Sequence, residues 1–355
     1  MKTVPIYRVC KQRTVPDWEP NQAVLWVWPQ DLKKREHLCS LYAKLLKIAA
    51  GHVHVILLVK NKQRMPELES YFLQQHPKLR LTVISTPSIN DIWIRDYGFF
   101  CVRSGTENNR LVQFQYAPSY VHKQYRANAK DDSDATKCAA VLLGFAIQKI
   151  PLVLDGGAIT HNGRGIAVLT QKAIDEAAIK AKLFSHLSKT LGFKQFIVVP
   201  HEPGDVTGHV DGIIRFLTPK TVAVVDYPRS YSIGHEYSQS LSKQLHVALG
   251  PRYKIVLIPC SPPSSKKSEG IPSAAGNYLN FVWLGKRLVV PQYGTNMDQV
   301  ALLQLKAVLP QTEILGFTPE LTKRLASLGG ILNCITTTVP VAGLKTGQLA
   351  MGHDY

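Results

Sequence analysis

A thiol, an imidazole and several carboxylates stand in short polar motifs along a chain that is otherwise largely apolar. The motifs are Trp93-Ile94-Arg95-Asp96, Gly208-His209-Val210-Asp211 and Asn333-Cys334-Ile335-Thr336. A thiol beside an imidazole can act as an activated nucleophile. Thiols, imidazoles and carboxylates are also metal ligands. The residue types alone therefore leave a cysteine hydrolase and a metal site open.

The spacing of these residues argues against a metal. Zinc sites show closely spaced ligands, and the sequence contains neither His-Glu-x-x-His nor Cys-x-x-Cys. His52 and His54 form a His-x-His pair, which is more simply explained as two residues on the solvent-exposed face of a strand. We therefore expect a site that works without a metal.

The number of carboxylates indicates a cationic substrate. A papain-like protease needs one carboxylate or carboxamide to orient its histidine, which leaves the other acids unexplained. A planar guanidinium offers paired N–H groups that a carboxylate accepts in bidentate fashion. Asp96 and Asp211 would hold the carbon of such a cation in front of the thiol of Cys334.

Each motif also has a plainer structural explanation when it is taken alone. His209 and Asp211 point the same way in an extended strand, and both would suit a solvated strand face. An acid next to an arginine, as at Asp96, is often a surface ion pair. A lone cysteine such as Cys334 is more often a small buried apolar residue. The functional interpretation therefore depends on the combination.

Two further motifs turn the polar residues into a repeat. They are Asp155-Gly156-Gly157 and Tyr278-Leu279-Asn280-Phe281. The steps from Asp96 to Asp155, Asp211, Asn280 and Cys334 are 59, 56, 69 and 54 residues. After each motif the hydrophobic pattern predicts a strand, a second strand, a helix and a third strand.

The third unit shows the predicted order most clearly. Its strands are predicted at 212–217, 222–226 and 253–259, and its helix at 234–249. The second unit is predicted to contain a strand at 166–170, a helix at 171–191 and a strand at 195–200.

The two ends of the chain are predicted to complete one unit together. The last motif is followed by a single strand at 335–339, and the amino-terminal part offers a strand at 24–28, a helix at 32–50 and a strand at 52–60. Five ββαβ units closed in this way predict a five-fold pseudosymmetric α/β propeller, a single catalytic domain over residues 1–355. A doubly wound sheet would need single strands alternating with helices. The segment 66–85 is predicted to be an inserted helix and strand.

Composition excludes several classes of protein. The 355 residues carry a net charge of +17, but the basic residues are scattered, which argues against nucleic-acid binding. No apolar run of about 18 residues and no amino-terminal leader pattern occur, so we expect a soluble cytoplasmic protein. A homo-oligomer is compatible with the sequence. The six cysteines are far apart, which indicates a reducing compartment; they are Cys10, Cys39, Cys101, Cys138, Cys260 and Cys334.

The five motifs, together with Trp18-Glu19-Pro20 and Trp28-Pro29, resemble agmatine deiminases and their bacterial peptidylarginine deiminase relatives. These proteins belong to the guanidine-modifying superfamily, and the resemblance covers nearly the whole chain. It implies a five-fold α/β propeller and a hydrolase acting on C–N bonds of amidines, which releases ammonia from a guanidinium without metal or cofactor.

The resemblance also implies roles for individual residues. Cys334 would be the nucleophile, His209 the general acid and base, and Asp96 with Asp211 the clamp on the guanidinium. Trp93, Asp155 and Asn280 would shape the pocket, and Asp205 would face the far end of the substrate.

Four positions depart from the family pattern. Phe99 replaces a proline, Asp155 a glutamate and Asn333 a histidine, and the segment 116–120 does not contain the usual Trp-Gly-Gly-Lys-Tyr. The leading interpretation is an agmatine deiminase of polyamine biosynthesis, which forms N-carbamoylputrescine and ammonia through a covalent thiouronium. The alternatives are a peptidylarginine deiminase and a non-enzymatic protein that binds a guanidinium.

Overall fold

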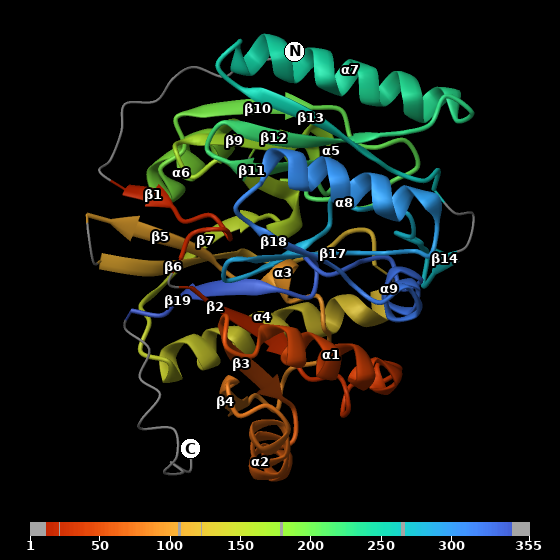
Figure 1. Cartoon of the computed structure of the whole chain (residues 1–355). Coiled ribbons are helices and arrows are strands. Elements are labelled where there is room, and N and C mark those ends of the chain that lie inside the picture. Colours follow the sequence, from red (N-terminus) through yellow and green to blue (C-terminus); the bar gives the residue numbers. More distant parts are fainter. Residues whose placement is uncertain are drawn as a thin grey trace.

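The computed structural model describes residues 12–20, 22–105, 108–121, 123–177, 180–263 and 267–342. These residues form a mixed α/β fold with several small sheets. Helix α7 (Ser232–Leu249) lies along the top of the view in Figure 1, and helix α2 (Met65–Gln75) lies at the bottom. The sheets occupy the space between these helices, so no single sheet runs through the molecule.

One strand arrangement recurs in the sheets. In the third unit β11 (Ile214–Thr218) pairs antiparallel with β12 (Thr221–Asp226), and β12 pairs parallel with β13 (Lys254–Pro259) after helix α7. A parallel pair requires such a crossover connection. The first unit has the same order, with β5 (Phe100–Ser104), β6 (Asn108–Gln115), α4 (Lys123–Leu142) and β7 (Ile147–Val153). The second unit has two helices in place of one, with β8 (Ile159–His161), β9 (Ile166–Thr170), α5 (Gln171–Glu176), α6 (Lys180–Leu191) and β10 (Gln195–Val199). The fourth unit has β16 (Val282–Leu284), β17 (Arg287–Val290), α8 (Asn296–Val308) and β18 (Glu313–Gly316).

The two ends of the described chain share one sheet, as the sequence predicts. The C-terminal strand β19 (Thr337–Pro340) pairs antiparallel with β2 (Gln22–Val27), and Figure 1 shows the two strands side by side. Helix α1 (Cys39–Ala49) then leads to β3 (His54–Val59), which is parallel to β2. This sheet therefore has the same ββαβ order, assembled from both ends.

The predicted inserted helix and strand are α2 and β4 (Arg80–Ser85). Strand β4 pairs parallel with β3, so the insertion widens the sheet by one strand. The sequence did not indicate β1 (Gln12–Thr14), which pairs antiparallel with β5. The remaining short elements are η1 (Glu36–Leu38), η2 (Lys62–Arg64), α3 (Ile94–Tyr97), η3 (Gly156–Ala158), β14 (Lys267–Ser268), β15 (Ile271–Pro272) and α9 (Pro319–Ala326).

Several predicted elements differ in their bounds from the observed ones. The helix predicted at 32–50 is α1, which begins only at Cys39, and the strand predicted at 335–339 is β19, which begins only at Thr337. The strand predicted at 212–217 begins only at Ile214, because the N–H groups of Ile213 and Ile214 both donate to the carbonyl of Val210 and form a turn. The helix predicted at 171–191 is two helices, α5 and α6, and residues 178–179 between them lie outside the described residues.

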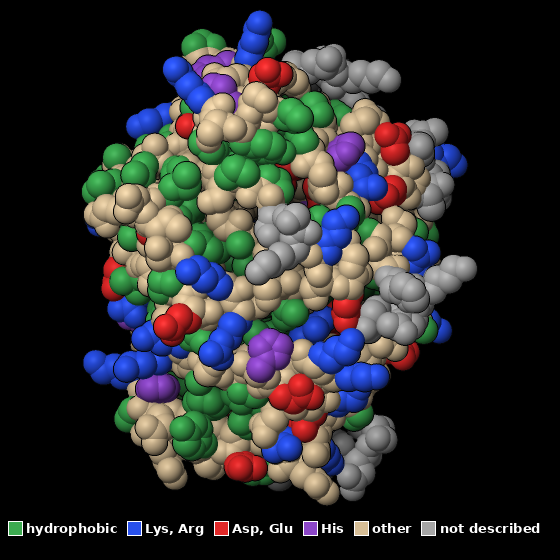
Figure 2. Space-filling model, turned by 90° about the vertical axis from the view of Figure 1, so that its right-hand side faces the viewer, with side chains coloured by type: hydrophobic (Ala, Val, Ile, Leu, Met, Phe, Trp, Pro, Cys, Tyr) green, Lys and Arg blue, Asp and Glu red, His purple; other side chains and the backbone are tan. Residues whose placement is uncertain are grey.

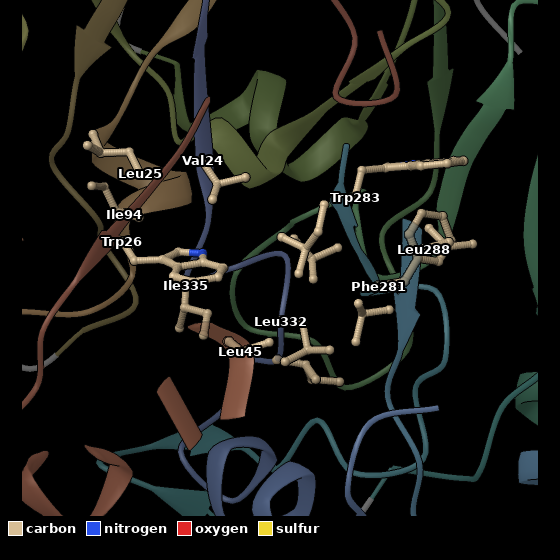
Figure 3. Packing of buried hydrophobic residues seen from close by; sticks show 14 of the residues in the cluster. Val24, Leu25, Trp26, Leu45, Ile94, Phe281, Trp283, Leu288, Leu332 and Ile335 are labelled. Atoms are coloured by element: carbon tan, nitrogen blue, oxygen red, sulfur yellow. The ribbon is translucent and has the colours of Figure 1, made fainter. Parts of the chain in front are cut away.

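Buried apolar residues anchor the polar motifs. Figure 3 shows Ile94, Phe281, Leu332 and Ile335 within the packed core, and each of them is 0% exposed. Each lies directly next to a motif residue in the chain, as Val210 does between His209 and Asp211. Burial of one such side chain is worth about 1.5–3 kcal/mol. The anchors therefore fix where their polar neighbours can point.

The surface carries both signs of charge. On the face shown in Figure 2, Lys and Arg side chains are spread among acidic, polar and apolar ones. None of the helices in the described part of the chain combines the length and the apolar character that a membrane span requires.

Candidate active site

All of the predicted site residues except Asp155 line one or both of two cavities that share part of their walls. The first cavity, about 120 Å³ in volume, is lined by His209, Asp211, Asn280 and Cys334 among others. The second cavity, about 60 Å³, is lined by Trp93, Asp96, His209 and Cys334 among others. His209 and Cys334 thus belong to both cavities, whereas each of the two predicted clamp acids, Asp96 and Asp211, belongs to one.

Asn280 holds the turn that carries the thiol. Its Oδ1 accepts hydrogen bonds from the backbone N–H groups of Asn333 at 3.0 Å and Cys334 at 3.3 Å. The thiol of Cys334 also lies 3.4 Å from this oxygen. On the other side of the turn, the carbonyl of Cys334 accepts the N–H of Arg95 at 3.0 Å. The cysteine is therefore fixed from two other motifs.

His209 lies among carboxylates. Its Nε2 is 3.1 Å from Oδ2 of Asp155, and its Nδ1 is 3.8 Å from Oδ1 of Asp96. The hydroxyl of Tyr120 donates to the same Asp155 oxygen at 2.7 Å and stands edge-on to the imidazole. Asp155 therefore holds the imidazole from a place outside the walls of both cavities.

The charges around His209 alter three pKa values. Burial alone would lower the pKa of His209, but the carboxylates of Asp96 and Asp155 raise it to about 10. Burial raises the pKa of Asp96 to about 7, although protonated His209 acts in the opposite direction. Burial has the largest effect on the Cys334 thiol and raises its pKa well above the ordinary value. The negative charges of Asp211 and Asp96 raise this pKa further. These shifts favour a charged imidazole and a neutral thiol at neutral pH.

Gly157 is required by the close packing of the imidazole. A Cβ atom at this position would lie 2.7 Å from Nδ1 of His209 and 2.9 Å from Oδ1 of Asp96. The N–H of Gly157 also donates to that Asp96 oxygen at 3.1 Å, and its carbonyl accepts the N–H groups of Val210 and Asp211. The backbone of the Asp-Gly-Gly motif therefore contacts and fixes both the motif of Asp96 and the motif of His209 and Asp211.

We expect Gly157→Ala to impair any reaction that uses His209 and to lower its kcat/KM by about 100-fold, because a displacement of about 1 Å in a reacting group has an effect of this size. The measurement is steady-state kinetics together with a melting curve. Gly316→Ala is the matched control, since its Cβ would be similarly crowded, at 2.9 Å from the side chain of Gln292, but lies outside the walls of both cavities. An active Gly157→Ala protein would show that the imidazole does not need its observed position.

A buried polar network holds Asp211. Its Oδ2 accepts the amide of Asn333 at 2.6 Å, and the amide oxygen of Asn333 accepts Nη2 of Arg95 at 3.2 Å. Arg95 also pairs with Asp17 at 3.0 Å, and Asp17 lies 3.6 Å from Arg215. Asn333, which stands where the related pattern has histidine, therefore links Arg95 to the carboxylate of Asp211.

Asp205 and Trp93 lie at different places in the walls. Asp205 lines the first cavity, and Thr207 and Gly208 donate three hydrogen bonds to its carboxylate. Trp93 lines the second cavity and packs so closely on Gly330 that a Cβ atom there would lie 2.5 Å from the indole ring.

Several residues of the site carried no signal that sequence reasoning could use. Tyr116 and Tyr120 line the second cavity, although the segment 116–120 lacks the related motif. Asp17, which stands next to the conspicuous Trp18-Glu19-Pro20, pairs with Arg95. The one sequence signal for Asp17 is its position directly before the motif Trp18-Glu19-Pro20.

The chain matches known proteins along most of its length. The family model described as Porphyromonas-type peptidyl-arginine deiminase matches residues 13–340. A protein of Shewanella sp. (strain MR-7), described as "Putative agmatine deiminase", is 26% identical over 367 residues, covering 91% of this chain and 93% of the relative.

Solved structures share the fold. The agmatine deiminase of Enterococcus faecalis has a TM-score of 0.77 at 20% identity, covering 93% of this chain and 96% of that one. The C. jejuni agmatine deiminase has a TM-score of 0.74 at 19% identity, covering 92% of this chain and 95% of that one. At such identities the likeness establishes a common fold and leaves the substrate to be argued from the site.

Proposed function

Because the chain belongs to the Porphyromonas-type peptidyl-arginine deiminase family, we propose that it hydrolyses the guanidinium of agmatine to N-carbamoylputrescine and ammonia. One observation carries the proposal: Cys334 and His209 line both cavities, while Asp96 lines one and Asp211 the other. A guanidinium held between the two acids would present its carbon to the thiol.

The first half of the proposed reaction forms a covalent intermediate. The bound cation offsets the charges of Asp96 and Asp211 that raise the pKa of the thiol, so Cys334 loses its proton to solvent as substrate binds. The thiolate attacks the guanidinium carbon. Protonated His209 then gives its proton to the departing nitrogen, the C–N bond breaks, and ammonia leaves a thiouronium on Cys334.

The second half releases the product. Neutral His209 takes a proton from a water molecule, and the resulting hydroxide attacks the thiouronium carbon. The C–S bond of the tetrahedral adduct breaks, its hydroxyl group loses its proton to solvent to give the neutral ureido product, and Cys334 is again a thiolate. Asp96 and Asp211 balance the positive charge of the intermediate. Asp155 and Asn280 act as positioning residues, which agrees with their contacts to His209 and to the turn of Cys334.

We further propose that the five larger sheets are the blades of a pseudo-fivefold α/β propeller within one catalytic domain. The recurring ββαβ order and the pairing of β19 with β2 support this arrangement. In such a ring each unit would contribute one motif to the centre, as the recurring spacing of the motifs suggests.

A peptidylarginine deiminase is the second candidate, since the family model bears that description. Side-by-side assays separate the two. We expect ureido product from agmatine, with kcat/KM at least about 100-fold higher than for free arginine or a blocked arginyl peptide. Faster turnover of the arginyl peptide would favour the second candidate.

Dialysis against a chelator tests the metal-free mechanism. We expect the chelator to leave the rate with agmatine unchanged. Loss of activity that is restored by added zinc would contradict the mechanism.

A further inference from the structure

The first cavity has an acidic lining in a basic protein. The whole chain has 42 Lys and Arg against 25 Asp and Glu. Yet Glu202, Asp205 and Asp211 all line this cavity, whereas His209 is the only basic residue among the described residues of its wall. Such a wall suits a ligand with positive charge along its length, including a charge beyond the guanidinium.

Asp205 is already engaged by its own loop. Its Oδ1 accepts the N–H of Thr207 at 2.9 Å and the hydroxyl of Thr207 at 2.8 Å, and its Oδ2 accepts the N–H of Gly208 at 2.6 Å. The hydroxyl of Thr207 in turn accepts the N–H of His209 at 3.1 Å. These bonds fix the turn at Gly208, where φ is +76°, and so the direction in which His209 leaves it.

Glu202 is placed differently. It is half-buried in the loop between β10 and β11, and the hydroxyl of Tyr227 donates to its Oε1. Among the described residues, the hydrogen bond from Tyr227 to Oε1 is the one side-chain hydrogen bond that Glu202 makes, which leaves its other oxygen, Oε2, outside that bond. A carboxylate held at one oxygen is oriented and keeps the other available for a cation.

We propose that Glu202 binds the primary ammonium at the far end of the substrate, whereas Asp205 positions His209. This inference rests on the proposed function, because it assigns the second charge of the same substrate. It identifies the preferred substrates as linear guanidines that end in an amine. The α-carboxylate of arginine would meet Glu202 as a like charge, and a peptide would offer a neutral amide in place of the ammonium.

The charge on Glu202 gives the inference a pH dependence. Burial raises the pKa of Glu202 to about 7, with Tyr227 lowering it and Asp205 raising it. The other titratable groups that face it are Tyr237 and Cys260, which are neutral at this pH. Below pH 7 the carboxyl takes up a proton and loses its attraction for an ammonium. We therefore expect KM for an amine-tailed guanidine to rise more steeply below pH 7 than KM for a neutral-tailed one.

The experiment compares agmatine with n-butylguanidine, which lacks the amine, on Glu202→Gln, Glu202→Asp and Asp205→Asn. For Glu202→Gln we expect KM for agmatine to rise about 10- to 100-fold, with KM for n-butylguanidine within about twofold of wild type. Glu202→Asp keeps the charge and should recover part of the loss. Asp205→Asn should lower kcat for both substrates to a similar extent.

Calorimetric binding to proteins that also carry Cys334→Ser supplies a readout that needs no turnover. Loss of affinity for agmatine alone in the Glu202→Gln background supports the proposal. Equal losses of affinity for both ligands, or no loss for either, overturn the proposal. A loss of affinity for agmatine alone in Asp205→Asn would show that Asp205, and not Glu202, binds the amine. If the wild-type protein turns over neither guanidine, the proposed function fails, while the binding comparison still decides whether Glu202 recognises the amine.

Discussion

Cys334→Ser is expected to lower kcat for agmatine by about 10⁴-fold or more, the largest effect of any single substitution in this protein. The proposed mechanism requires a nucleophile that ionises when substrate binds. Burial, Asp211 and Asp96 already raise the pKa of the thiol well above its ordinary value. A serine hydroxyl is far harder to ionise than a thiol, so the same surroundings would leave it protonated and unreactive.

The size and position of the side chain change little in this variant, so its melting temperature should stay close to that of the wild type. Cys138→Ser is the matched control, because Cys138 is an exposed free cysteine outside the walls of both cavities. It should keep full activity. A folded Cys334→Ser protein with near-normal turnover would rule out covalent catalysis by this residue.

His209→Gln is expected to lower kcat by about 10²- to 10⁴-fold, the range that general acid–base catalysis contributes. Glutamine can still form hydrogen bonds in place of the imidazole, but it cannot pass a proton to the departing ammonia or accept one from water. His201→Gln is the control, since His201 is an exposed histidine a few residues earlier in the chain. Equal activities of the two variants would remove the proton-transfer role from His209.

The pH profile tests the same assignment. Asp96 must be ionised to bind the cation, so kcat/KM should rise with pH through about 7, where the pKa of Asp96 lies. His209 must be protonated to release ammonia, so activity should fall as pH rises through about 10. A profile that continues to rise above pH 10 would contradict this role.

The raised pKa of His209 also links folding to pH. The folded protein binds the imidazole proton more tightly than the unfolded chain does. This stabilisation is therefore fully present below the ordinary histidine pKa, about 6.5. It is lost as pH rises through about 10. His209→Gln should accordingly lower the melting temperature more at pH 6 than at pH 10.

Local patterns in the sequence determined the elements and their order. Strand β9, predicted at 166–170, has those bounds because a run of four apolar residues followed by a β-branched threonine can form a buried strand without information from elsewhere. The alternation of two strands, a helix and a strand after each motif is likewise a property of neighbouring residues. The motifs also identified Cys334, His209, Asp96 and Asp211, which the fold brings to two adjoining cavities.

Only the tertiary structure decided how these residues are held. Tyr120 meets Asp155 across 35 positions, Arg95 meets Asp17 across 78, and Asn333 meets Asp211 across 122. Such contacts depend on how separate units pack, and hydrophobic periodicity describes only neighbours along the chain. For the same reason Glu202 and Asp205, two acids three residues apart, looked alike in the sequence. In the folded protein, the carboxylate of Asp205 is hydrogen-bonded within its own loop. The carboxylate of Glu202 instead accepts a hydrogen bond from Tyr227 and lines the first cavity.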